Sequence, residues 1–168
     1  MMLSRRAALV GLFCVSANAA VGQDLGPSGP AVRPSATPPG EILDNKDLMA
    51  LYEALGYDVS AVYGLFQAVR SAFQKQDITA FADLCLFPLL LFANKERRAI
   101  ANRDDVEARR EAIFSPPVRE TVERQQFQSL GVSDHGIMYG SGQLWLQARC
   151  QDRACKQLNY GVATINAV

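Results

Sequence analysis

The sequence predicts an α+β domain in which helices cover one side of an antiparallel sheet. Two observations support this prediction. Apolar residues recur at helical spacing in the first half of the folded part, and strand-like apolar segments separated by glycines fill the region beyond Gly131. The chain contains no internal repeat.

Acidic residues that suit the N-cap position precede two of the first three predicted helices. A short helix is expected over 47–55, ended by Gly56, and a second over 58–76, capped by Asp58. The second carries one apolar stripe, formed by Val59, Val62, Tyr63, Phe66, Val69 and Phe73. Asp77 can cap a short helix through Cys85, which we expect Pro88 to stop before a strand over 88–93.

The second half is expected to hold two helices and then strands. Asn94 and Lys95 form a turn into a strand over 97–101, and Asn102 opens a helix with acidic residues in its first turn. Ser115, followed by two prolines, is expected to cap a helix that ends near Gln126. The remaining strands are predicted over 137–139, 143–147 and 158–165.

Residues 1–20 have the pattern of a signal peptide. Arg5 and Arg6 form a basic region, residues 7–17 an apolar core, and Ala17-Asn18-Ala19 a cleavage site. We therefore expect a periplasmic or secreted protein. The arginine pair also fits a twin-arginine signal, but general secretion is the favoured interpretation. Residues 21–44 are rich in proline and glycine and predict a flexible linker, so the single domain is expected over 45–168.

Composition excludes some classes of partner. The chain has 17 basic and 17 acidic residues, a formal net charge of zero, which gives no electrostatic basis for nucleic-acid binding. The apolar run 84–93 is too short for a membrane helix and contains Pro88, so no membrane span is expected in the mature chain.

The order of these segments resembles the NTF2-like (SnoaL-like) superfamily over roughly residues 55–168. The resemblance rests on the long helix 58–76, on D-I-T-A-F-A-D-L (77–84) leading into F-P-L-L-L, and on N-R-D-D-V (102–106) opening a helix that ends in I-F. It also rests on G-I-M-Y-G-S-G-Q-L-W (136–145) and a last strand ending in A-T-I-N. It implies a curved sheet wrapped around helices to form a cone with an apolar pocket. The superfamily includes isomerases, hydratases and scaffolds, so the resemblance does not assign an activity.

Cys150 and Cys155 lie on the two sides of a predicted hairpin tip. Facing positions of an antiparallel pair are close enough for a disulfide, and an exported protein meets an oxidising compartment. We therefore predict a structural disulfide. A redox pair and a zinc site are less favoured, since the spacing is C-x4-C and too few other ligands remain. Cys85 is interpreted as a buried free thiol.

The candidates for chemistry each have a simpler structural interpretation. His135, the single histidine, could act with Asp134, but a solvated loop histidine is favoured. Asp77 or Asp83 could act as a base with Tyr63 or Tyr139 in an apolar pocket, although Asp77 is explained as a cap. Trp145 either lines the pocket or belongs to an external patch that meets another subunit. These two interpretations remain open.

A charged cluster covers residues 95–111. Lys95, Arg97, Arg98, Arg103, Arg109 and Arg110 alternate with acidic residues at spacings that allow pairs one helical turn apart. A solvated face is the favoured interpretation, and a surface for an anionic partner is the alternative.

The leading hypothesis is an exported, non-catalytic protein. It would bind a small apolar ligand or a protein partner through Tyr63, Tyr139 or Trp145, without a cofactor or metal. A homodimer through the sheet would also fit an external patch. The alternatives are a small pocket enzyme, an isomerase or hydrolase-like activity, and an accessory subunit of an envelope complex. A cavity filled by side chains, with an apolar patch outside, would favour partner binding.

Overall fold

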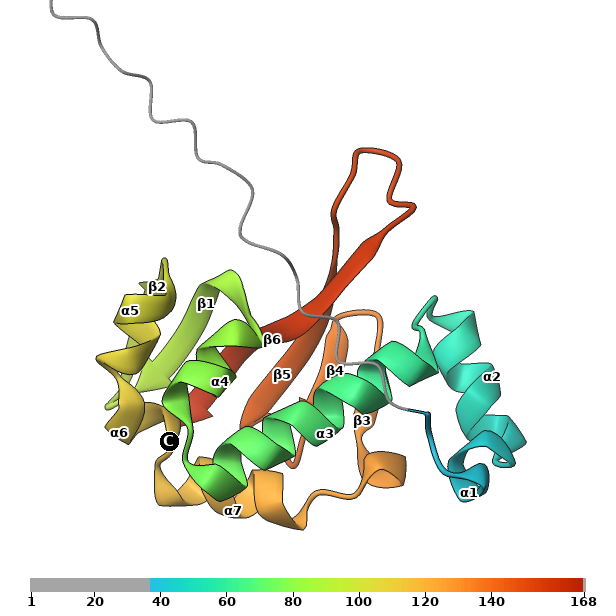
Figure 1. Cartoon of the computed structure of the whole chain (residues 1–168), viewed down its shortest axis with the longest axis horizontal. Helices are drawn as coiled ribbons and strands as arrows, with labels where there is room; N and C mark the ends of the chain where they lie inside the picture. The colour runs from blue at the N-terminus through green and yellow to red at the C-terminus, as the bar shows by residue number, and fades with distance from the viewer. Residues whose placement is uncertain (1–36, 168) are drawn as a thin grey trace, which may run out of the picture.

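A computed structural model describes residues 37–167, which form an α+β arrangement of seven helices and a six-stranded mixed sheet (Figure 1). The helices are α1 Gly40–Leu43, α2 Lys46–Ala54, α3 Val59–Lys75, α4 Ile78–Asp83, α5 Arg103–Glu107, α6 Arg110–Ile113 and α7 Pro116–Arg124. The strands are β1 Cys85–Ala93, β2 Glu96–Ile100, β3 Gly131–Ser133, β4 Gly136–Tyr139, β5 Leu144–Cys150 and β6 Leu158–Ala167. The expected signal peptide lies outside the described residues.

The strand order is β2-β1-β6-β5-β4-β3. The last strand therefore inserts between β1 and β5, where it pairs parallel to β1 and antiparallel to β5. The α+β class is confirmed, but the expectation of a purely antiparallel sheet is wrong. The chain between β1 and β6 supplies the connection that a parallel pair requires. In Figure 1 the long helix α3 and helix α7 lie over one face of the sheet.

Three of the four expected helix caps are confirmed. The side chain of Asp58 accepts hydrogen bonds from the backbone N–H of Ser60 and Ala61. Asp77 accepts one from Ala80, and Asn102 accepts one from Asp105. Ser115 is different, because its side chain makes no cap hydrogen bond even though α7 begins directly after it. The role predicted for the Ser115 hydroxyl is wrong.

Proline 88 lies within a strand and does not end a helix. Helix α4 ends at Asp83, and β1 already begins at Cys85. Because proline has no N–H to donate, it is tolerated at irregular points of a sheet. The pairing of β1 with β6 indeed shifts register between Cys85 and Leu90.

Part of the expected linker is folded. Helix α1 lies within residues 21–44, and its Ile42 is buried in the core with the residues of the other helices. Burial of this one large apolar side chain holds α1 against the core, although the segment around it is rich in proline. Strand β3 was not expected, since three residues are too few to show an alternating pattern.

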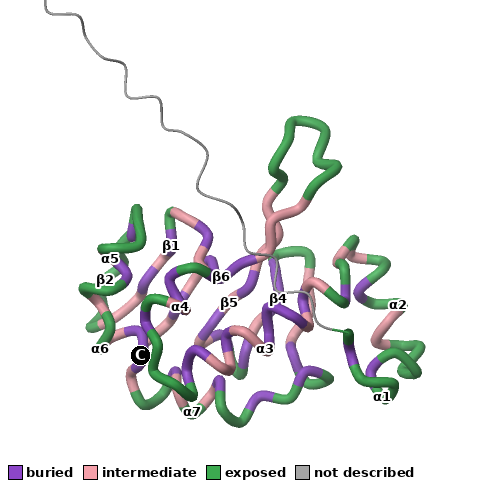
Figure 2. The backbone as a smooth tube through the Cα atoms, in the orientation of Figure 1, coloured by how far each residue is buried: buried purple, intermediate pink, exposed green. Residues whose placement is uncertain are grey.

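The apolar stripe of α3 faces the core as predicted. Val62, Phe66, Val69 and Phe73 are each at most 2% exposed. They pack against the inner face of the sheet, represented by the buried side chains of Leu91, Leu144 and Ile165. Figure 2 shows the buried backbone concentrated in α3 and the central strands, whereas the tip of the β5–β6 hairpin projects outward and is exposed.

Candidate functional site

Aromatic rings fill the space between α3 and the inner face of the sheet. The ring of Phe127 lies 5.2 Å from Tyr63, 5.6 Å from Phe66 and 5.7 Å from Tyr52, measured between ring centroids. Phe66 in turn stacks on Tyr139 at 5.7 Å. Rings at these separations and angles make favourable contacts in addition to the area they bury. This part of the interior is occupied by the protein's own side chains.

Tyr139 belongs to this aromatic cluster. It is 0% exposed, and its hydroxyl has no hydrogen-bond partner among the described residues. Burial raises the pKa of Tyr139 well above its ordinary value, and the neighbouring Tyr52 raises it further. Tyr63 lies at the edge of the cluster, where it is half-buried and its hydroxyl accepts a hydrogen bond from the Gln67 amide at 2.7 Å. Neither tyrosine faces a carboxylate base in these contacts.

Trp145 lies on the outer face of the sheet. Its neighbours Leu144 and Leu146 are buried in the core, at 0% and 1% exposure, so Trp145 points to the opposite side of β5 and is half-buried. This placement bears on the two interpretations left open by the sequence. It favours the external patch over the pocket lining.

The strand register aligns a row of residues across this outer face. Trp145 pairs with Thr164 on one side and Met138 on the other, Thr164 pairs with Leu90, and Leu90 pairs with Ala99. We call the row formed by Leu90, Thr164, Trp145 and Met138 the outer row. All four side chains are half-buried, whereas the inner residues next to them in sequence are buried.

Gly142 and Gly136 lie directly beside the Trp145 indole. A Cβ atom at Gly142 would lie 3.3 Å from the indole Nε1, and one at Gly136 would lie 3.6 Å from Cε3. Both glycines have positive φ, at 104° and 138°, a backbone conformation that side-chain-bearing residues rarely adopt. The indole therefore lies close to the backbone of these two glycines, where a larger residue would crowd it.

A cation borders the apolar outer face. The guanidinium carbon of Arg97 lies 6.0 Å from the ring centroid of Phe92, its register partner on β1. At another point, Arg149 donates to the backbone oxygen of Phe87 at 2.7 Å. The outer face thus combines the mostly apolar outer row with two arginines that make specific contacts.

The candidate acids and the histidine are dispersed. Asp77 and Asp83 lie at opposite ends of α4, where Asp77 caps the helix and Asp83 pairs with Arg103. His135 is 83% exposed and contacts the equally exposed Asp134 at 2.5 Å between Nδ1 and Oδ1. These contacts do not bring the acids or the histidine together with Tyr63 or Tyr139. No group of three metal-ligating side chains is found within 37–167.

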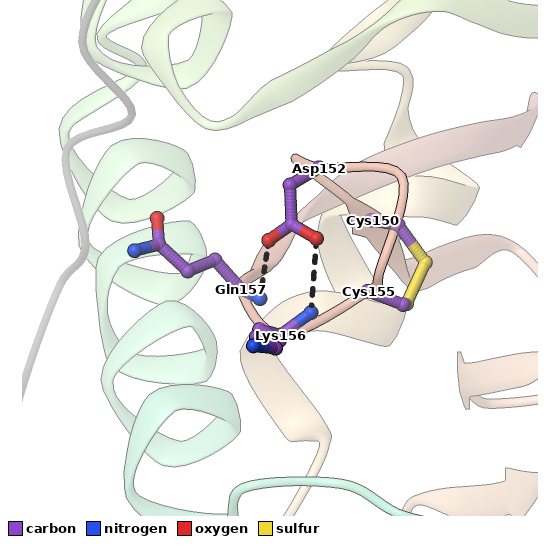
Figure 3. The surroundings of a disulfide bond; sticks show 5 residues. All are labelled: Cys150, Asp152, Cys155, Lys156 and Gln157. Carbon is purple, nitrogen blue, oxygen red and sulfur yellow. Dashed lines mark hydrogen bonds between the residues drawn. A yellow bond between two sulfur atoms is a disulfide. The ribbon is translucent and has the colours of Figure 1, made fainter.

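The cysteines follow the predicted pairing. Cys150 and Cys155 form a disulfide, with Cα atoms 4.7 Å apart, at the tip of the β5–β6 hairpin (Figure 3). The Asp152 carboxylate accepts hydrogen bonds from the backbone N–H of Lys156 and Gln157 inside this loop. Cys85 is free, as predicted, and the residue as a whole is half-buried. Its thiol contacts the Phe81 carbonyl at 3.4 Å, and burial raises the pKa of the thiol.

The charged cluster is not uniformly a solvated face. Arg98 lies on the inner side of β2, opposite Leu91, and pairs with Glu96 at 2.6 Å. Arg110 donates to the Gln76 carbonyl, and Arg109 is half-buried. These three arginines line one open hollow between the end of the sheet and α6.

Comparisons with known proteins give no match to this chain, whether with family models, with curated proteins or with solved structures. Over the described ranges, no helix combines the length and apolar character needed to cross a membrane.

Proposed function

We propose that this protein is an exported, non-catalytic binding protein that engages a protein partner through the outer face of its sheet. The observation that carries the proposal is the half-buried indole of Trp145, which lies in the outer row beside Gly136 and Gly142. Aromatic side chains dominate the binding energy of many protein interfaces, and a rigid aromatic loses little entropy on binding.

The aromatic interior supports a protein partner over a small apolar ligand. Side chains of Tyr52, Phe66, Phe127 and Tyr139 fill the region where an apolar ligand would be expected inside a cone. The apolar side chains of Leu90, Met138 and Trp145 remain half-exposed outside. A partner with an apolar patch bordered by a carboxylate would match this face, because Arg97 lies beside Phe92 at its edge.

The NTF2-like cone and export belong to the same proposal. The mixed sheet with α3 across its inner face is compatible with a cone around helices. Two features are typical of a protein that works outside the cytoplasm. They are the signal-peptide pattern of residues 1–20 and the Cys150–Cys155 disulfide. Such a protein could also act as an accessory subunit of an envelope complex, which is one form of partner binding.

Complementation of a deletion strain of the native host tests the proposal. The Trp145→Ala variant should lose the biological role while circular dichroism shows that it remains folded. His135→Ala and Asp83→Asn serve as controls, since both side chains lie away from the outer row and should be dispensable. A folded His135 or Asp83 variant that loses all function, while Trp145→Ala retains it, would favour the pocket enzyme instead.

A further inference from the structure

The sheet has two edge strands, β2 and β3, and they differ in how far they are covered. Strand β3 is only three residues long, and the Tyr57 hydroxyl donates a hydrogen bond to its Ser133 backbone oxygen at 2.8 Å. Strand β2 is longer, and its residues 96–99 are all exposed. Since an edge strand presents backbone groups that no neighbour pairs with, β2 is the edge at which another chain can add a strand.

The turn between β1 and β2 sets the direction of the backbone groups of β2. Its two residues, Asn94 and Lys95, have positive φ angles of 54° and 63°, as in the type I′ turn of a two-residue hairpin. Ala93 and Glu96 flank this turn and are register partners. Residues that flank such a turn form a hydrogen-bonded pair, and such pairs alternate with non-hydrogen-bonded ones along the ladder. The backbone groups of residues 96, 98 and 100 therefore face β1.

Arg97 and Ala99 direct their backbone N–H and C=O groups away from β1 by the same alternation. Within residues 37–167, no backbone hydrogen bond joins either residue to a segment other than β1. The β2 edge contains no proline, and its register with β1 shows no bulge, so two common devices that block an edge are missing from it. The outward groups match those of an extended segment, which forms main-chain hydrogen bonds at alternate residues.

The charges on the β2 edge favour an acidic segment. Glu96 is paired with Arg98, whereas Lys95 and Arg97 form no ion pair with the described residues. A carboxylate opposite Arg97 would lie on the same face of the sheet, and opposite charges that face each other across two strands stabilise the pairing. A second copy of the chain fits less well. The antiparallel register in which two β2 strands overlap most fully places Arg98 opposite its own equivalent.

We propose that the partner adds an extended acidic segment to β2, antiparallel to it, with a carboxylate opposite Arg97. This inference rests on the proposed function, because it describes how the same partner joins the sheet. Leu90 of the outer row is the register partner of Ala99, so the outer row leads directly to the β2 edge. Three strand spacings, about 14 Å in all, separate Trp145 from Ala99, and one protein can span that distance.

Photo-cross-linking in the native host tests the added strand. A benzophenone amino acid at position 99 keeps its backbone N–H, and it should give a product with the same host protein as a benzophenone at position 145. Mass spectrometry of the linked peptide should identify an acidic residue close to the linked site. The reason is that Arg97 lies two residues from position 99, on the same face of β2.

Two variants test the backbone and the charge contributions separately, with the benzophenone kept at position 145. Ala99→Pro should lower the yield of the product about fivefold or more, because proline has no N–H to donate. Arg97→Glu should lower the yield to a similar extent, because it places like charges opposite each other. Circular dichroism checks that each variant is folded, and Arg97→Glu decides if Ala99→Pro does not fold.

Lys46 provides a matched control for each variant. It is an exposed cation at the first position of α2, which lies at the opposite end of the molecule from β2 in Figure 1. Both proline and glutamate are favourable at the start of a helix. Lys46→Pro and Lys46→Glu should therefore leave the yield of the product at position 145 unchanged.

The outcomes separate this inference from the proposed function. A product at 145 that persists undiminished in folded Ala99→Pro and Arg97→Glu, or the lack of a product at 99 alone, would overturn the added strand and leave the proposed function standing. A linked segment without acidic residues, or a product at 99 only with a second copy of this chain, would overturn the acidic partner. The lack of a product at both positions would overturn both proposals.

Discussion

The rings of Phe66 and Tyr139 stack at 5.7 Å with an interplanar angle of 20°, and this contact joins α3 to β4. Phe66 is 2% exposed, and it also contacts Phe127 and Tyr63. We therefore expect Phe66→Ala to lower the free energy of unfolding by about 3–5 kcal/mol, because it removes a large buried ring and leaves a cavity. Denaturant unfolding measures this loss. A loss below about 1 kcal/mol would show that α3 does not pack on the sheet in this way.

Alkaline pH should destabilise the fold through the buried tyrosines. Burial raises the pKa of Tyr139 above the ordinary value of 10.0, so the unfolded chain loses this proton at a lower pH than the folded chain does. Stability is therefore full below pH 10 and should fall as the pH rises above it. Denaturant unfolding across this range should show a shallower decline for Tyr139→Phe. If the unfolding free energy fell equally with pH in both proteins, burial of the Tyr139 hydroxyl would not be the cause of the decline.

The hairpin disulfide should act locally. Replacing Cys150 and Cys155 by serine opens a short loop, so the unfolding free energy should fall by at most about 2 kcal/mol. The tip is exposed, and trypsin should cut after Arg153 or Lys156 faster in this variant than in the unmodified protein. Cleavage after Lys46 on α2 serves as the internal control. Free thiols at both positions in protein purified without reductant would contradict the disulfide.

Export predicts a defined mature N-terminus. The basic, apolar and small-residue segments within residues 1–20 place cleavage directly before Ala20. N-terminal sequencing of protein isolated from its native host should therefore read from that point. An intact Met1 would contradict export by this signal.

Local sequence patterns predicted most elements because their causes are local. The N-cap residues Asp58, Asp77 and Asn102 act within four residues of themselves, and their roles were confirmed. Ser115 is also a residue type favoured at the N-cap, but its hydroxyl is buried and makes no cap contact. The parallel pairing of β1 with β6 joins segments about 75 residues apart, and no local pattern encodes it.

For the candidate surfaces too, local patterns predicted some features, whereas others depend on the tertiary fold. Alternation along β5 placed Trp145 opposite Leu144 and Leu146, but the face it occupies depends on which side the helices cover. Gly140 and Gly142 marked a break between strands, and nothing local indicated that Gly136 and Gly142 lie beside an indole. The sequence did mark Arg109 as part of a charged cluster. That its Nε atom is buried without a partner within residues 37–167 follows from tertiary packing, which no local pattern encodes.

Site-specific photo-cross-linking in the native host tests the central claim most directly. A benzophenone amino acid at position 145 should give a product with one distinct host protein, and the same group at Glu120 on the exposed side of α7 should not. The benzophenone at 138 should reach the same protein, because Met138 is the register partner of Trp145. A product only with a second copy of this chain would assign the outer face to a homodimer. That result, or the absence of any specific product, would contradict partner binding through the outer face.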